Sequence, residues 1–176
     1  DFFRRWIEAH DRTFAFDGEH NHTEFLPDAG TLQRLAGYTR ARRHLHFFDL
    51  QQKLAIHRGI KEVYDVISGP AGQKRDWEKM RSLFTPEARM IAVAKTKAGE
   101  IRRVPMSDED YIKQSGPYLE TNGFCEKEVT RRVEVYGIVA HVFSTYESRM
   151  KASDEKPFMR GSYSFQLLND GKRWWV

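Results

Sequence analysis

Cysteine is almost absent from this chain of 176 residues, in which Cys125 is the single example. One cysteine can form neither a disulfide within the chain nor a cysteine-ligated metal cluster. Cys125 also lies inside a strand-like run, where a lone cysteine is most often a small buried hydrophobe. The sequence therefore excludes a scaffold held together by internal disulfides.

Long apolar runs are absent as well. No stretch approaches the roughly 18 apolar residues that a membrane-spanning helix needs, and residues 1–6 resemble no signal peptide. We therefore expect no membrane association and, by default, a cytoplasmic location. Hydrophobic residues still make up 40% of the chain and aromatic residues 13%, which is enough for a packed core.

The net charge of +4 is mild but unevenly distributed. Residues 1–28 carry seven acids against three arginines, whereas residues 29–58 carry six lysines and arginines against Asp49 alone. A basic surface for a partner is one interpretation, and two solvated segments that face each other is another. The basic stretch lacks the glycine and aromatic residues of a single-strand-binding platform, so we do not expect nucleic-acid binding.

Histidine is concentrated in the first 57 residues, which hold six of the seven. His20 and His22, with Glu19, Asp17 and His10 nearby, form the most metal-like group. An i, i+2 pair of imidazoles can chelate zinc or copper, but the pattern fits no standard motif such as HExxH. We expect no metal and no cofactor.

The chain changes character near Leu54, which divides it into an N-terminal extension (1–54) and a domain (55–176). Apolar spacing predicts helices over 2–12 and 31–50 of the extension, with Gly37 weakening the second. These segments are too apolar for a free tail. We expect them to be ordered and to act as a lid or as an arm exchanged with a second subunit.

The domain has clearer periodicity and an α+β order of elements. Apolar residues on one face predict helices near 56–68 and 75–84, and Ser107 begins a third helix. Residues 88–94 and 101–104 are predicted to pair as strands. Four further antiparallel strands are predicted over 124–136, 138–150, 157–168 and 172–176.

Three stretches carry a resemblance to a known family. They are residues 75–89, with the sequence RDWEKMRSLFTPEAR, residues 137–147, with the sequence GIVAHVFSTYE, and residues 161–176, which end in GKRWWV. In order and spacing they resemble the NTF2-like (SnoaL-type) family over roughly residues 55–176. The resemblance implies a strongly curved antiparallel sheet wrapped on N-terminal helices in a cone, around a pocket.

The resemblance implies two functions. One is binding of a small hydrophobic molecule by a homodimer, with conversion by proton transfer of the isomerase, cyclase, dehydratase or hydrolase type. The other is a non-catalytic interaction domain, and the charge distribution then indicates the basic segment 34–58 as its contact with a protein or nucleic acid. Fold alone does not choose between them.

Candidate site residues follow from the expected packing of helices on the central strand. His141 is the candidate proton-transfer residue because its pKa is easily moved near neutrality, although a histidine that is satisfied within the sheet is the alternative. We expect Tyr64, Trp77 and His141 to reach one common cavity. The aromatic residues expected to bind a ligand, or else to form core, are Tyr64, Trp77, Phe84, Tyr111 and Trp175.

Several charged residues fall on neighbouring predicted strands. Arg131, Arg132, Glu134, Glu147 and Arg149 are expected to form cross-strand ion pairs on the solvated face. A carboxylate turned into a pocket would instead have a raised pKa and could transfer protons. Imperfect alternation along these strands leaves the faces of Glu134 and Glu147 unassigned.

Overall fold

A computed structural model describes the backbone of residues 39–96 and 98–176, and their side chains from Leu50 onward. Three expectations concern residues before this part. The helix predicted over 2–12 lies outside it, as does the first part of the helix predicted over 31–50. The lid or arm expected of residues 1–54 lies mostly outside it. Within it, no helix combines the length and apolarity required to cross a bilayer.

Three helices precede the main sheet in the described chain: α3 (Thr39–Ile67), α4 (Trp77–Leu83) and α5 (Asp108–Asn122). The helices predicted near 56–68 and 75–84 are confirmed as α3 and α4. The helix α3 runs unbroken from Thr39, so the boundary placed at residue 54 falls inside it. Its C-terminal half buries an apolar stripe. The helix ends three residues before Pro70, because proline cannot continue a helix. The stripe consists of Ile56, Ile60, Val63, Tyr64 and Ile67.

Two antiparallel sheets complete the α+β fold. The hairpin of β1 (Met90–Lys95) and β2 (Ile101–Met106) forms one, and the other is four-stranded in the order β3-β4-β5-β6. The latter contains β3 (Cys125–Tyr136), β4 (Val139–Arg149), β5 (Met159–Asn169) and β6 (Trp174–Trp175). Every strand predicted from the sequence is therefore present. The last strand is shorter than predicted.

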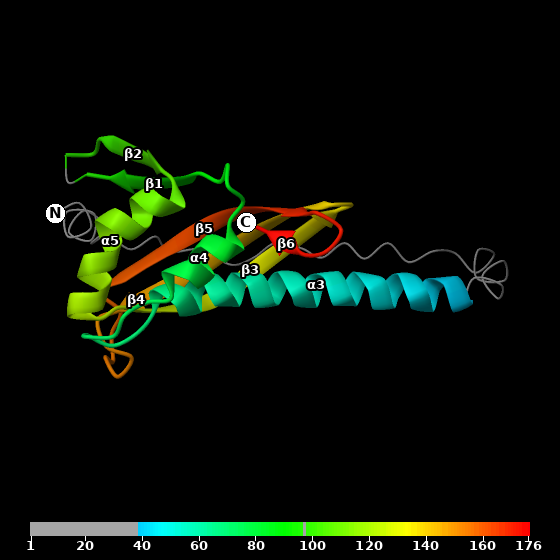
Figure 1. Cartoon of the computed structure of the whole chain (residues 1–176), viewed down its shortest axis with the longest axis horizontal. Helices are drawn as coiled ribbons and strands as arrows, with labels where there is room; N and C mark the ends of the chain where they lie inside the picture. Colours follow the sequence, from blue (N-terminus) through cyan, green and yellow to red (C-terminus); the bar gives the residue numbers. More distant parts are fainter. Residues whose placement is uncertain (1–38, 97) are drawn as a thin grey trace.

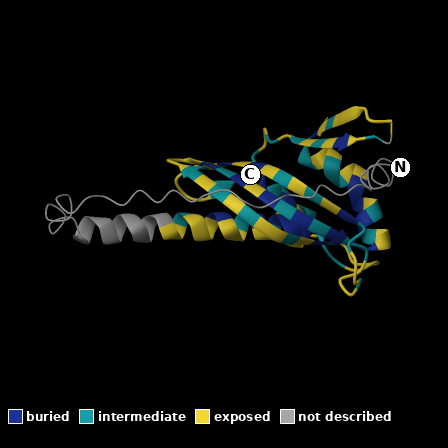
Figure 2. Cartoon of the chain, turned by 180° about the vertical axis from the view of Figure 1, so that it is seen from behind, coloured by how far each residue is buried: buried dark blue, intermediate teal, exposed yellow. Residues whose placement is uncertain are grey.

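The four-stranded sheet has one covered and one open face. On β4, the even-numbered residues from Ala140 to Ser148 are buried and the residues between them are more exposed, as period-two alternation requires. Figure 1 shows α3 lying along this sheet and extending past the ends of the strands. Buried residues concentrate around the C-terminal half of α3, where it meets the sheet (Figure 2).

The buried side chain of Arg75 joins the helices to one another. Its guanidinium donates hydrogen bonds to the carbonyls of Ile67 at 3.2 Å, Gly69 at 2.7 Å and Leu119 at 3.0 Å. These carbonyls lie at or near the C-terminal ends of α3 and α5, where helices leave acceptors unsatisfied. A Cβ atom at Gly69 would lie 2.7 Å from the Arg75 guanidinium. Arg75 therefore fixes where both helices end.

Arg75→Ala should lower the free energy of unfolding by about 2–4 kcal/mol, because it removes a buried side chain together with its hydrogen bonds to the carbonyls of Ile67, Gly69 and Leu119. Arg89 is exposed, and the hydrogen bond it donates in the described part of the chain is to the carbonyl of its neighbour Ala88, so Arg89→Ala should change stability by no more than about 0.5 kcal/mol. Urea unfolding of the two variants is the measurement. Equal effects would contradict the role of Arg75.

Candidate functional site

The covered face of the four-stranded sheet has a polar half and an apolar half. Residues directly opposite each other on paired strands share a face, and the registers of β3, β4 and β5 define both halves. The polar half contains Glu126, Glu128, Arg131, Ser144, Tyr146, Ser148 and Tyr163. The apolar half contains Val133, Val135, Ala140, Val142, Phe165 and Leu167.

A β-bulge on β3 creates the polar half. The register of β3 against β4 shifts between Glu128 and Thr130, so Val129 is an extra residue on β3. Val133 then faces the same side as Glu128, although the two are five positions apart. The bulge turns both Glu126 and Glu128 towards the helices.

Glu126 is buried, with 7% of its surface exposed. The Tyr163 hydroxyl donates to its Oε1 at 2.7 Å, and the Ser148 hydroxyl donates to its Oε2 at 2.9 Å. Its backbone N–H donates to Ser68 just beyond α3. Burial raises the pKa of Glu126 to about 7, and the two hydroxyl donors only partly offset this rise. Glu126 therefore gains and loses its proton near neutral pH.

Three tyrosines surround this carboxyl group. Tyr146 and Tyr163 stack with ring centroids 4.5 Å apart, and Gly161 opposite Tyr146 leaves the space that the Tyr146 hydroxyl occupies. Tyr111 comes from α5. Burial raises the pKa of all three phenols, and the nearby Glu126 charge adds to each rise. These phenols therefore stay protonated and can act as hydrogen-bond donors.

Glu128 has a different set of partners from Glu126. It pairs with Arg131, whose guanidinium also donates to the His57 carbonyl of α3 at 3.2 Å. The Ser144 hydroxyl donates to Glu128 Oε1 and lies 2.7 Å from the Tyr64 hydroxyl. A cation thus compensates the charge of Glu128. In contrast, the described structure places two neutral hydroxyl donors on Glu126.

His141 lies on the opposite face of the sheet. It pairs across the strands with Glu134 and Gln166, its side chain is 36% exposed, and its Nε2 lies 3.0 Å from the Ser164 hydroxyl. The expectation that His141 shares a cavity with Tyr64 and Trp77 is therefore wrong. Alternation on β4 turns His141 away from the helices, while its neighbours Ala140 and Val142 are buried.

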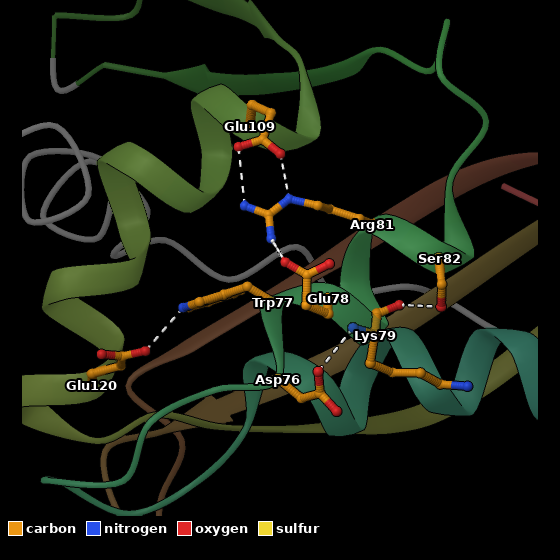
Figure 3. Close-up of polar contacts among 8 residues, drawn as sticks. All are labelled: Asp76, Trp77, Glu78, Lys79, Arg81, Ser82, Glu109 and Glu120. Carbon is orange, nitrogen blue, oxygen red and sulfur yellow. Dashed lines mark hydrogen bonds and ion pairs between the residues drawn. The ribbon is translucent and has the colours of Figure 1, made fainter.

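The expected ligand-binding aromatic residues separate into three places. Tyr64 and Tyr111 lie by the polar half of the sheet. Trp77 donates to Glu120 at 2.9 Å and packs on Gly116, between α4 and α5 (Figure 3). Phe84 and Trp175 line an open hollow of about 500 Å³ together with Arg81 and Arg173. None of the residues that line this hollow belongs to the Glu126 group.

The hollow is less suited to chemistry than the buried carboxyl group. Its two arginines already have partners, because Arg81 binds Glu78 and Glu109, and Arg173 donates to the Ser82 carbonyl and covers the Trp175 ring. Among the described residues, no group of three or more histidine, cysteine or acidic side chains could hold a metal ion.

The fold and its interior therefore define an α+β protein with a buried carboxyl group that exchanges a proton near neutral pH, surrounded by phenols. Sequence analysis missed Glu126, Tyr146, Ser148 and Tyr163. The bulge at Val129 was the feature needed to find the acid. Comparisons of the chain with protein-family models, with curated proteins and with solved structures find no match.

Glu126→Gln should remove a pH dependence of stability. Between about pH 4.5 and 7 the folded protein holds a proton on Glu126 that the unfolded chain has lost, so stability falls as the pH rises through this window. This shift in the pKa of Glu126 corresponds to a loss of about 3 kcal/mol in the free energy of unfolding by pH 8, relative to acidic pH. Urea unfolding at pH 5 and pH 8 measures the loss.

The exposed outer-face variant Glu134→Gln is the matched control and should retain the wild-type difference between the two pH values. Wild type and Glu126→Gln losing the same stability from pH 5 to pH 8 would contradict the assignment.

Proposed function

We propose that this chain is an NTF2-like pocket protein that binds a small, largely apolar molecule between its helices and the sheet, and that Glu126 transfers a proton to or from that molecule. The observed order supports the proposal: helices, a hairpin, a third helix and a four-stranded meander. The same order underlies the resemblance in the sequence. We also propose that the four-stranded sheet is strongly curved into a cone around the ligand.

The buried carboxyl group carries the proposal. Burying a carboxyl group without a neighbouring cation costs folding free energy. Groups whose pKa is shifted in this way cluster at functional sites, where a group that titrates near neutral pH is needed. Glu126 is the one buried acid among the described side chains. Its hydrogen bonds from Tyr163 and Ser148 hold the carboxyl group in one orientation. A general base or acid needs this combination of pKa and fixed geometry.

The reaction uses only side chains of this chain. The ionised Glu126 accepts a proton from a carbon or oxygen atom of the ligand and becomes a carboxylic acid. The electron pair stays on the ligand, where the negative charge develops on an oxygen that accepts hydrogen bonds from Tyr146 or Tyr111. Return of the proton to a second atom completes an isomerisation, and no oxidant or cofactor is consumed.

The two halves of the sheet indicate the shape of the ligand. A carbonyl or hydroxyl group would lie at the polar half, near Glu126. The body of the molecule would lie over the apolar half, against residues such as Val142 and Phe165, which are buried. Apolar surroundings with a few placed polar groups are typical of small-molecule sites.

The open face of the sheet favours a homodimer. Val139, Phe143 and Leu168 are exposed there at 48%, 37% and 44%. They lie together because Val139 pairs with Leu168, and Phe143 faces the same side. A second copy would remove this apolar surface from water.

A non-catalytic interaction domain is the second candidate function. Leu50 and Leu54 on α3 are exposed at 53% and 40%, within the basic segment 34–58. An apolar stripe on a basic helix suits a protein partner. In this alternative the polar half of the sheet would be structural only.

The photoacid 2-naphthol tests the proposed function, because it is a small apolar phenol that releases its proton on excitation. At pH 8 the wild type should bind it and enhance naphtholate emission by accepting the proton on Glu126. Glu126→Gln should bind about tenfold or more weakly, because a hydrogen bond to a charged group is lost, and the naphthol bound to it should emit from the neutral form.

Glu134→Gln on the outer face is the control and should match the wild type. Absence of saturable binding by the wild type would contradict the pocket. Equal naphtholate emission from wild type and Glu126→Gln would contradict proton transfer by Glu126.

A further inference from the structure

Among the helices and strands, α5 mainly contacts α4 and β2, and its C-terminal end is also bonded to the loop between α3 and α4. Figure 3 shows that the two polar attachments to α4 lie near opposite ends of α5, one at Glu109 and the other at Glu120. The attachments differ in strength, and the helix between them is interrupted. Tyr111 lies on the N-terminal side of this interruption and packs against the core cluster that contains Tyr146, which stacks on Tyr163, the hydrogen-bond donor to Glu126.

The C-terminal attachment is extensive and partly buried. The Arg75 guanidinium donates to the Leu119 carbonyl at 3.0 Å, and the Arg75 backbone N–H donates to Glu120 at 3.1 Å. The Trp77 indole donates to the same carboxylate at 2.9 Å. Leu119 itself is fully buried. This end of α5 is therefore held firmly against the end of α3.

Among the described residues, the polar contact that holds the N-terminal half of α5 to α4 is one exposed ion pair, and beside it Tyr111 and Ile112 pack on the hydrophobic core. Arg81 binds Glu109 through both Nε and Nη2, and these side chains are 35% and 61% exposed. Arg81 also binds Glu78 of its own helix at 2.6 Å. The hydrogen bonds from Arg81 lower the pKa of Glu109, but exposed ion pairs stabilise weakly and are screened by salt.

The interruption lies at Gly116 and Pro117. Pro117 has no N–H to donate to the carbonyl of Lys113, so the helix lacks a hydrogen bond at this point. Gly116 packs directly on Trp77, with 3.2 Å between the ring and the position of a Cβ atom. Helices bend where a proline removes a bond of this kind.

We propose that residues 108–115 of α5 are a lid over Glu126, latched by the Arg81–Glu109 ion pair and hinged at Gly116 and Pro117. Opening moves Tyr111 away from Glu126 and exposes the carboxyl group, while residues 118–122 stay in place. The use of the lid for ligand entry rests on the proposed function, but its opening can be measured without any ligand.

Hydrogen exchange of backbone amides in the full chain tests the lid. In Glu109→Gln, residues 108–115 should exchange about two- to fivefold faster than in the wild type, as expected for loss of one exposed ion pair. Residues 118–122 should keep the wild-type rate. Salt at 1 M should raise the wild-type rate over 108–115 towards that of the variant.

Two variants serve as matched controls. Glu78→Gln removes a charge from the same Arg81 without separating the helices, and Asp108→Asn removes a charge from the same first turn of α5 while keeping its oxygen acceptor for the Glu109 N–H. Both variants should change the exchange rate over 108–115 by less than about twofold. This change is smaller than the two- to fivefold increase expected for Glu109→Gln. Unchanged exchange in Glu109→Gln would overturn the lid.

Equal acceleration over 108–115 and 118–122 would also overturn it, because α5 would then detach as a unit. The association rate of 2-naphthol provides a separate readout. A faster rate in Glu109→Gln supports entry through the lid, and an unchanged rate with faster exchange contradicts entry by this route. Absence of naphthol binding contradicts the proposed function and leaves the exchange result standing.

Discussion

The arrangement of the described chain depends on the buried guanidinium of Arg75. Its hydrogen bonds link the end of α3, the loop that follows it and the end of α5. Burial lowers the pKa of Arg75, but the group keeps its charge because arginine does not lose its proton in proteins. Backbone carbonyls rather than a carboxylate compensate much of that charge. The ends of α3 and α5 are thereby held together beside the loop that carries Arg75.

The second constraint is the bulge on β3, since it decides which carboxylates face the helices. Without the extra residue Val129, Glu126 and Glu128 would lie on the solvated face whenever Val133 and Val135 lay inside. With it, one strand supplies both an apolar inner surface and two inward-facing acids. The two acids then differ, because Arg131 pairs with Glu128 whereas the described side chains that donate to Glu126 are the hydroxyl groups of Ser148 and Tyr163.

Element order could be predicted from the sequence, and the candidate site could not. Turn residues such as Asn169 and Gly171 bound the strands, and the apolar spacing on α3 is local, so both are visible in the chain. The face of a strand is also predictable while its alternation is regular, which would have placed His141 outside beside buried Ala140 and Val142. A bulge has no comparable local signature, because any residue can be the extra one. Glu126 was therefore hidden among Lys127, Arg131 and Arg132 as one more surface charge.

The central claim is that Glu126 holds a buried proton that it exchanges near neutral pH. Nuclear magnetic resonance of glutamate side-chain carboxyl carbons, followed from pH 3 to pH 9, tests it directly. The account predicts one resonance with a midpoint near 7 that is absent from Glu126→Gln. A Glu126 resonance with its midpoint near the ordinary value of 4.5 would contradict the account.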